Sequence, residues 1–336
     1  MILPSGNEDL LDEFISDKPT CLVGCLSFEE RSINVPLIYG RKAPIGLQRL
    51  LRIDDPQDAF PNYASDIEKK CDSHRKQLRE AAIDVRKAEI GLNLLSTEDD
   101  LLDVLYDVRR LVEGTGSLIL DITSLPKRVF CILLKGMLRG KWCENLLVTY
   151  TTPGKAGYTK EHLATDALPC DHLPGMGGKV PLGQGTLVVA LGFEELNIRS
   201  IMEEYNGRND TKFIMSYPTI PEVERRQWAM LRQLLPAKHP INLAQNLKPI
   251  AGWDAEQVYI TLKKWRLQNP EIVMAPFGVK THTLGMALFA IEHDLGLFYT
   301  QPKSYNPSYT QGSGKVLSYL TKWRGLAAYE RQLVLP

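Results

Sequence analysis

The sequence contains one short pattern twice, and this repeat constrains the fold more than any other feature. Residues 22–33 are LVGCLSFEERSI and residues 187–198 are LVVALGFEELNI, so that Leu, Val, Leu, Phe, Glu, Glu and Ile fall in register. Each copy is an apolar run that leads into Phe-Glu-Glu. A true structural repeat must also repeat its later elements in the same order.

The segments that follow the two copies do recur in the same order. In the first half we expect an apolar-then-polar segment at residues 49–56 and two helices at 63–80 and 96–113. We then expect an apolar run with a lysine turn and a helix at 117–138, and a closing strand at 145–153. In the second half, the comparable segments are residues 212–221, 222–235, 254–268, 271–293 and 296–302. The helix at 254–268 is expected to begin at an Asp254 cap.

Short apolar runs that alternate with helices are typical of βαβ units and a parallel sheet. The sequence therefore predicts an α/β protein of two tandem Rossmann-like modules, each a doubly wound parallel sheet, related by internal duplication. We place the first module at residues 1–165 and the second at residues 186–336. Residues 166–185 are rich in Pro and Gly without an apolar period, which predicts a linker.

Charge and cysteine content exclude several classes of protein. Lys+Arg and Asp+Glu both number 40, which excludes the strongly basic surface of a protein that coats duplex nucleic acid. The six cysteines include no CxxC pair, and this favours a reducing compartment. The first residues lack a signal-peptide pattern, and no apolar run approaches the roughly 20 residues that span a bilayer. These features predict a soluble, cytoplasmic protein with no membrane partner.

Two turns in each half are candidate ligand-binding sites. Ligands of open α/β sheets bind beyond the carboxyl ends of the strands, which selects the turns after the first and fourth strands. These turns lead into helix N-termini, whose free amides favour an anion, and both fourth-strand turns carry a lysine. We therefore predict a phosphorylated ligand. The candidate ligand-binding residues are Ser27, Phe28, Glu29, Glu30, Arg31, Asp121, Thr123, Ser124, Lys127, Arg128, Phe193, Glu194, Glu195, Gly278, Lys280 and Thr281.

Several of these candidates also have a purely structural interpretation. Phe28 and Phe193 could pack against the ends of the strands that precede them. The paired glutamates could open helices, where acidic side chains interact favourably with the helix dipole. Arg31 and Arg128 could belong to a solvated surface.

Other motifs that would assign chemistry do not occur. Cys170-Asp171-His172 is an isolated group in the expected linker, so no metal site is predicted there. His282 has no matching histidine in the first half, which argues against a paired-histidine phosphoesterase. The sequence holds no Walker loop, no GxGxxG after the first strand, no GxSxG and no HExxH. We therefore assign no cofactor and no metal, and the catalytic residues stay unknown.

The turn within LILDITSLPKRVF, residues 118–130, resembles the fourth-strand turn of CRISPR-associated Rossmann-fold (CARF) ligand-binding domains. Asp121, Thr123, Ser124 and Lys127 take the places of the acid, the threonine, the small residue and the lysine of that motif. The small glycine pair of the family is replaced by Ser124-Leu125, and the turn at residues 277–280 diverges further. The resemblance covers both halves as topology and about ten residues as motif.

This resemblance implies a function in prokaryotic antiviral defence. CARF domains act in pairs, and the related SAVED domains look like two such domains in one chain that bind oligonucleotide second messengers. The resemblance thus implies a sensor that binds a nucleotide or cyclic oligonucleotide between its two halves and signals to a protein effector, with a homo-oligomer as a further possibility. Two alternatives stay open: a ring nuclease or nucleotide hydrolase of the same fold, and a non-catalytic structural subunit of a defence complex.

Overall fold

A computed structural model describes residues 8–16, 20–42, 47–54, 61–81, 89–113, 115–159, 164, 166–178, 185–192, 201, 210–217, 221–234 and 242–331. The chain forms two compact units. The first comprises Met1–Glu161 together with Lys303–Pro336, and the second comprises His162–Pro302. The second unit is therefore an insertion within the first.

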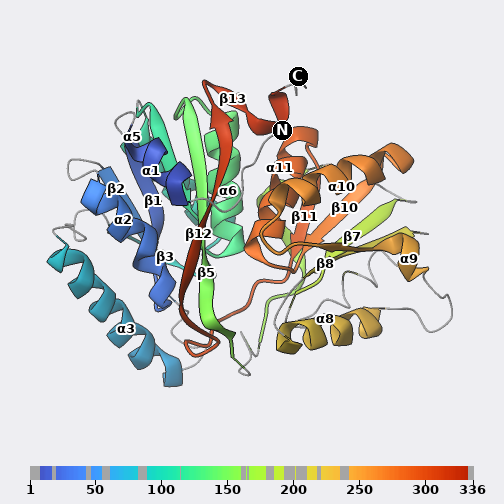
Figure 1. Ribbon diagram of the computed structural model, residues 1–336, viewed down its shortest axis with the longest axis horizontal. Helices are drawn as coiled ribbons and strands as arrows, with labels where there is room; N and C mark the ends of the chain where they lie inside the picture. Colours follow the sequence, from blue (N-terminus) through green and yellow to red (C-terminus); the bar gives the residue numbers. More distant parts are fainter. Residues whose placement is uncertain are drawn as a thin grey trace. The chain divides into compact units, whose positions relative to one another are not determined.

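The first unit contains a seven-stranded sheet in the order β13-β12-β5-β4-β1-β2-β3. Strands β1 to β5 are parallel to their neighbours, whereas β12 runs antiparallel to β5 and β13 antiparallel to β12. In Figure 1 the red strand β12 lies beside the green strand β5. The strands are β1 Thr20–Leu26, β2 Leu47–Asp54, β3 Glu89–Asn93, β4 Ser117–Asp121, β5 Asn145–Tyr158, β12 Thr310–Trp323 and β13 Leu326–Ala327.

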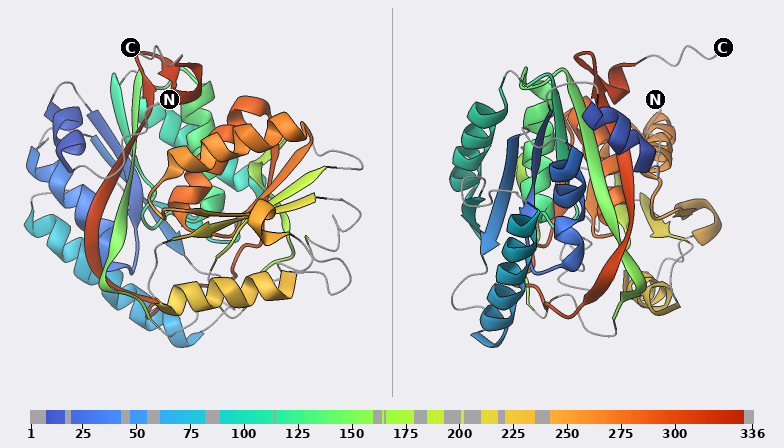
Figure 2. Two further views of the ribbon diagram at one scale, coloured as in Figure 1. Left: turned by 45° about the vertical axis from the view of Figure 1, so that its right-hand side comes forward. Right: turned by 60° about the vertical axis from the view of Figure 1, so that its left-hand side comes forward.

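Helices cover both faces of this sheet, as the apolar strand sequences require (Figure 2). Leu22 of β1 packs in a core cluster with side chains of α1 and α2, and Leu26 of β1 packs with Leu78 of α3. Helices α5 and α6 contact each other, and α5 begins with a capping box formed by Thr97 and Asp100. The helices are α1 Glu8–Ser16, α2 Asn34–Lys42, α3 Pro61–Glu80, α5 Glu98–Val112 and α6 Lys127–Arg139, with short 3₁₀ turns η1 Glu30–Ile33 and η2 Ala328–Glu330.

The second unit contains a six-stranded sheet in the order β6-β11-β10-β7-β8-β9. All neighbours are parallel except the edge strand β6, which is antiparallel to β11. Its strands are β6 Asp171–Gly177, β7 Thr186–Ala190, β8 Asp210–Ser216, β9 Leu247–Ile250, β10 Ile272–Pro276 and β11 Gly296–Tyr299. Its helices are α8 Pro221–Leu234, α9 Leu243–Asn246, α10 Ala255–Gln268 and α11 Lys280–His293.

The two sheets share one strand order. Each places its third, second, first, fourth and fifth parallel strands side by side and adds an antiparallel strand beside the fifth. This confirms the predicted α/β class with two Rossmann-like modules. The predicted cap is also confirmed, because the Asp254 carboxylate accepts a hydrogen bond of 2.8 Å from the Gln257 amide. Descent of the two modules from an internal duplication stays a prediction.

The division of the chain differs from the predicted one in two respects. The predicted linker, residues 166–185, contains strand β6, which completes the edge of the second sheet. Residues 303–336, predicted to belong to the second module, complete the first unit instead through β12 and β13. Glycines at the start of β12 interrupt its alternation of apolar and polar residues, and its pairing partner β5 is remote in sequence. The local sequence therefore indicated neither the strand nor its place in the first sheet.

No helix within the described ranges combines the length and the apolar character that crossing a membrane requires.

Candidate functional site

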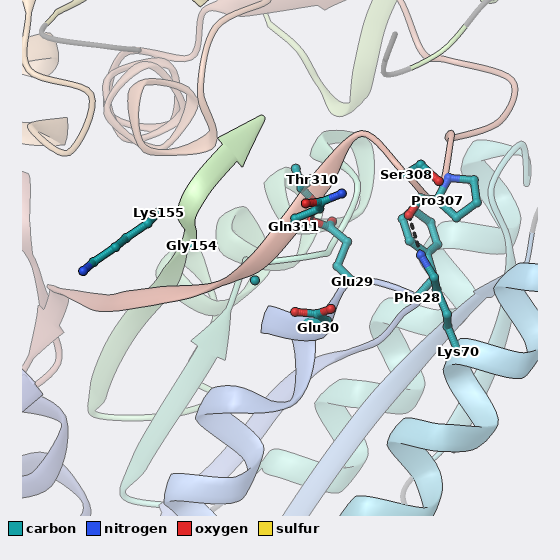
Figure 3. Close-up of a pocket in the computed structure, with 11 residues that line it drawn as sticks. Phe28, Glu29, Glu30, Lys70, Gly154, Lys155, Pro307, Ser308, Thr310 and Gln311 are labelled. Atoms are coloured by element: carbon teal, nitrogen blue, oxygen red, sulfur yellow. Dashed lines mark hydrogen bonds between the residues drawn. The ribbon is translucent and has the colours of Figure 1, made fainter. Parts of the chain in front are cut away.

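A pocket of about 480 Å³ opens in the first unit where β1 ends. This is the carboxyl end of the parallel strands, the edge at which open α/β sheets bind ligands. Figure 3 shows that its walls come from the turn after β1, from α3, from β5 and from the segment that leads into β12. The lining residues are Phe28, Glu29, Glu30, Lys70, Gly154, Lys155, Pro307, Ser308, Thr310, Gln311 and Gly312.

The turn after β1 is fixed by hydrogen bonds to its own backbone. The Ser32 amide donates to the Glu29 carbonyl at 2.9 Å, and the Ser32 hydroxyl donates to the Ser27 carbonyl at 3.2 Å. His74 of α3, which is buried, places its Nδ1 at 2.7 Å from the same Ser27 carbonyl. The Phe-Glu-Glu turn is therefore held in one conformation at the mouth of the sheet.

Glu29 and Arg31 form a buried ion pair beneath the pocket. The Glu29 Oε2 atom lies 2.7 Å from Arg31 Nε and 2.6 Å from Arg31 Nη2, and both side chains are almost fully buried. Arg31 Nη1 also donates to the Tyr150 hydroxyl at 2.9 Å and to the Thr151 carbonyl at 3.1 Å. Burial alone would lower the pKa of Arg31, but the nearby Glu29 carboxylate and tyrosines raise it well above its usual value. Arg31 is thus permanently charged and serves to hold the turn.

Aromatic rings surround this ion pair. The rings of Tyr158 and Tyr309 stack with centroids 6.2 Å apart, and Phe28 meets Tyr309 edge-on at 6.5 Å. The Arg31 guanidinium lies 5.4 Å from the centre of the Tyr150 ring. Burial raises the pKa of Tyr158 and of Tyr309, so both hydroxyls stay protonated and act as neutral partners. Phe28 therefore has a packing role on one side while it lines the pocket on the other.

Three charged side chains in the pocket are available to a ligand to different degrees. Glu30 and Lys155 are exposed, and among the residues that the structure describes neither forms a hydrogen bond or an ion pair. Lys70 Nζ donates to the Pro307 carbonyl at 2.7 Å, which leaves two of the three ammonium donors for other partners. The pocket lining thus combines two cations with the Glu30 carboxylate, beside the Glu29 carboxylate that is paired with Arg31.

Glycines shape the wall where β5 meets β12. A Cβ atom on Gly154 would lie 3.0 Å from the Cα of Gly312, and Gly312 has a φ of +69°. The strand register shifts at this point, which indicates a β-bulge of the kind that often borders functional sites. Side chains are therefore excluded here, and backbone atoms are accessible from the pocket.

The fourth-strand turn of the first unit is used internally. Asp121 Oδ1 accepts hydrogen bonds from the Thr123 hydroxyl at 2.5 Å and from the Thr149 hydroxyl at 3.3 Å. The Ser124 hydroxyl donates to the Cys25 carbonyl at 3.3 Å. Lys127 begins α6 and is 7 % exposed. None of these four predicted ligand contacts is among the residues that line the pocket.

Arg128, the next residue, also bonds to the protein itself. Its Nη1 donates to the Leu94 carbonyl at 3.1 Å and its Nη2 to the Ser96 carbonyl at 2.7 Å. Burial lowers the pKa of Arg128 below its usual value. Arg128 therefore fastens the loop between β3 and α5 to the start of α6.

In the second unit, Lys280 begins α11 after β10, as Lys127 begins α6 after β4. Because β4 and β10 are the fourth parallel strands of their sheets, the two lysines occupy equivalent strand ends, as predicted. Gly278 lies against the backbone after β7, since a Cβ there would meet the Leu191 carbonyl at 3.0 Å, and the Thr281 hydroxyl donates to the Gly252 carbonyl. Phe193, Glu194 and Glu195 lie outside the described residues.

The structure therefore brings together only part of the predicted set. Phe28, Glu29 and Glu30 meet in one pocket, whereas the fourth-strand turn contributes nothing to its lining. Sequence reasoning missed Lys70, Lys155 and the residues from Pro307 to Gly312. The glycine-rich run at residues 312–314 was the only local signal for this wall. Within the described part of the chain, no group of three or more His, Cys, Asp or Glu side chains could hold a metal ion.

Protonation of His74 is expected to loosen the pocket turn. Burial lowers the pKa of His74 below its usual value, so the folded state favours the neutral ring while the unfolded chain takes up a proton near pH ~6.5. The stability that the neutral His74 ring contributes to the folded state is present above pH ~6.5 and is lost as the pH falls towards the pKa of His74 in the folded state. We expect His74→Asn, which keeps an N–H donor for Ser27, to lose less stability than the wild type between pH 7 and 5. Urea unfolding at each pH measures this, with His172→Asn on the exposed edge strand β6 as the control; equal losses in wild type and His74→Asn would contradict it.

Comparisons with known proteins place the chain in no family. No protein-family model matches it, and no curated protein matches it. Among solved structures, the cytoplasmic domain of a prokaryotic cation chloride cotransporter is 9% identical, covers 85% of this chain and 96% of its own, and has a TM-score of 0.24. A protein named as a UDP-N-acetylglucosamine 2-epimerase from Listeria monocytogenes is 11% identical, covers 76% of this chain and 73% of its own, and has a TM-score of 0.24. TM-scores of this size carry no argument about fold or function.

Proposed function

We propose that the first unit binds a phosphorylated ligand of the nucleotide class in the pocket at the end of β1. The observation that carries this proposal is that Lys70, Lys155 and Glu30 all line one pocket at the carboxyl edge of a parallel sheet. Ammonium groups bind phosphate oxygens, and an unpaired carboxylate accepts hydrogen bonds from sugar hydroxyls or exocyclic amines. The Phe28 ring offers an apolar face beside these charges.

For the hydrolase alternative, Glu29, Glu30 or Lys127 would assist the attack on a phosphate, and the surroundings of these residues favour binding over cleavage. Glu29 is neutralised by Arg31 at 2.6 Å, so it is a poor general base, and Lys127 lies outside the pocket lining. Glu30 alone is available to activate a water molecule. A hydrolase is therefore the second candidate, and it predicts that the bound ligand is consumed during incubation.

The wider role that we propose is that of a nucleotide or cyclic-oligonucleotide sensor in prokaryotic antiviral defence, located in the cytoplasm and acting on a protein effector. This part of the proposal depends on the resemblance of the turn at residues 121–127 to CARF domains. The shared strand order of the two units suits a pair of such modules. The residues of the turn at 121–127 make structural contacts within the first unit. We therefore infer that this chain binds its ligand in the pocket at the end of β1 and not at that turn.

Calorimetric titration with ATP, inorganic tripolyphosphate and cyclic oligoadenylates tests the binding site. We expect at least one of these probes to bind, and Lys155→Met to weaken that binding about tenfold because a charge-assisted hydrogen bond is lost. Lys141→Met, on the exposed turn between α6 and β5, is the matched control and should leave binding unchanged. Absence of heat with all three probes, or equal losses in the two variants, would refute the proposed site.

A further inference from the structure

One wall of the pocket is the chain segment that returns from the second unit. Residues 303–312, which we call the strap, run from the end of the second unit at Pro302 into the start of β12. Five of the eleven lining residues belong to the strap, namely Pro307, Ser308, Thr310, Gln311 and Gly312. A ligand in the pocket would therefore contact the part of the first unit that follows the second unit in the chain.

The strap is attached to the first unit from three directions. Lys70 of α3 donates to the Pro307 carbonyl at 2.7 Å. The Thr159 amide donates to the Tyr309 carbonyl at 2.9 Å, and the Thr159 hydroxyl to the Ser308 carbonyl at 2.9 Å. The Thr310 hydroxyl donates to Glu29 Oε2 at 3.2 Å. These contacts join the strap to α3, to the end of β5 and to the Phe-Glu-Glu turn. Figure 3 shows the Lys70–Pro307 contact.

The residues just before the strap, Gln301 and Pro302, are paired with the backbone of residues 167–168 in the second unit. The Leu168 amide donates to the Gln301 carbonyl at 2.9 Å, and Ala167 forms an antiparallel bridge with Pro302. The segment that leads into the second unit and the segment that leaves it are thus paired with each other twice, at Thr159 with Ser308 and Tyr309 and at residues 167–168 with residues 301–302.

Only four residues, 303–306, lie between Pro302 and Pro307. Asn306 closes a turn there, because its side-chain oxygen accepts from the Ser308 amide at 2.9 Å and its carbonyl accepts from the Tyr309 amide at 3.3 Å. A short backbone segment therefore joins the pocket wall at Pro307 to the paired residues Gln301 and Pro302.

We propose that the strap couples occupancy of the pocket to the order of the backbone pairing between residues 167–168 and residues 301–302 of the second unit. For its ligand this inference rests on the function proposed above. A ligand that contacts Lys70 or Glu30 on one side and Ser308 or Thr310 on the other cross-links the strap to the first unit. The restrained strap then stabilises the Leu168–Gln301 pairing. The coupling is reciprocal, so a partner that orders the pairing of residues 167–168 with residues 301–302 raises the affinity of the pocket for its ligand.

Amide hydrogen exchange of the full chain tests the coupling without any ligand. Lys70→Met removes the donor to Pro307, and Lys69→Met is the matched control, because Lys69 is exposed and pairs only with Asp66 among the described residues. We expect Lys70→Met to accelerate exchange about 2- to 10-fold at the strap and at the Leu168 amide, as loss of one hydrogen bond predicts. Lys69→Met should change neither, and the amides of α10 should be unchanged in both variants.

A second variant and a ligand arm complete the test. Thr159→Val, which removes the hydroxyl donor to Ser308, should accelerate the Leu168 amide in the same way. Whichever of ATP, tripolyphosphate and the cyclic oligoadenylates binds in the calorimetric titration should, at saturation, slow exchange of the Leu168 amide in the wild type. The inference is overturned if Lys70→Met and Thr159→Val accelerate the strap alone, or if the acceleration extends equally to α10. Failure of the proposed function appears differently, as an absence of binding by all three probes while the two variants still accelerate the Leu168 amide.

Discussion

Replacing Arg31 with methionine is expected to lower the free energy of unfolding of the first unit by about 3–5 kcal/mol. The substitution leaves the Glu29 carboxylate buried without its cation, since Arg31 supplies both nitrogen atoms within 2.7 Å of Oε2. It also removes the donor to the Tyr150 hydroxyl and the Thr151 carbonyl. Urea unfolding followed by circular dichroism measures the loss.

The double replacement Glu29→Gln with Arg31→Met separates charge from packing. It removes both charges and should cost less than the sum of the two single substitutions, because neither buried charge is left without its partner. Arg110→Met is the control for a surface ion pair with Asp107 and should stay within about 0.5 kcal/mol of the wild type. An effect of Arg31→Met as small as that of Arg110→Met would show that the ion pair does not hold the turn.

Replacing Lys322 with methionine is expected to destabilise the first unit by about 2–4 kcal/mol. Lys322 of β12 is 4 % exposed, and its Nζ donates to the Met137 carbonyl at 3.1 Å and to the Gly140 carbonyl at 3.0 Å. These carbonyls lie at the end of α6, where the helix leaves its last acceptors unsatisfied and a cation interacts favourably with the dipole. Methionine fills the space but leaves both acceptors without the ammonium donor.

Lys315→Met provides the comparison on the same strand. Lys315 is exposed, so its substitution should change stability by no more than about 0.5 kcal/mol. Thermal unfolding of the three proteins measures both effects. If Lys322→Met unfolds at the same temperature as Lys315→Met, the contact with α6 contributes nothing to the attachment of β12.

The sequence predicted those parts of the fold that have a local cause. The apolar run of β1 and the capped helices α5 and α10 are specified by neighbouring residues, and the repeat at residues 22–33 and 187–198 correctly indicated two sheets of one class. The place of β12 was not predictable in this way. Its pairing with β5 joins residues at least as far apart as Tyr158 and Thr310, and no periodicity within one segment encodes such a partner.

The candidate site divides along the same line. The Phe-Glu-Glu turn was found because it follows an apolar strand, and Phe28, Glu29 and Glu30 do line a pocket. The sequence could not show that Glu29 forms an ion pair with Arg31, because an arginine at this position is as compatible with a solvated surface as with a buried ion pair. Nor could it place Lys70 beside Pro307, since that contact depends on the return of the chain after a whole inserted unit.

The position of β12 also sets an order of events during synthesis. Strand β5 leaves the ribosome long before its edge partner, and every residue of the inserted unit is made in between. Until β12 arrives, β5 presents an open row of backbone donors and acceptors that any other extended chain could join. Because such long-range pairings form slowly, the nascent first unit is the stage at which this protein is most exposed to aggregation and to chaperones.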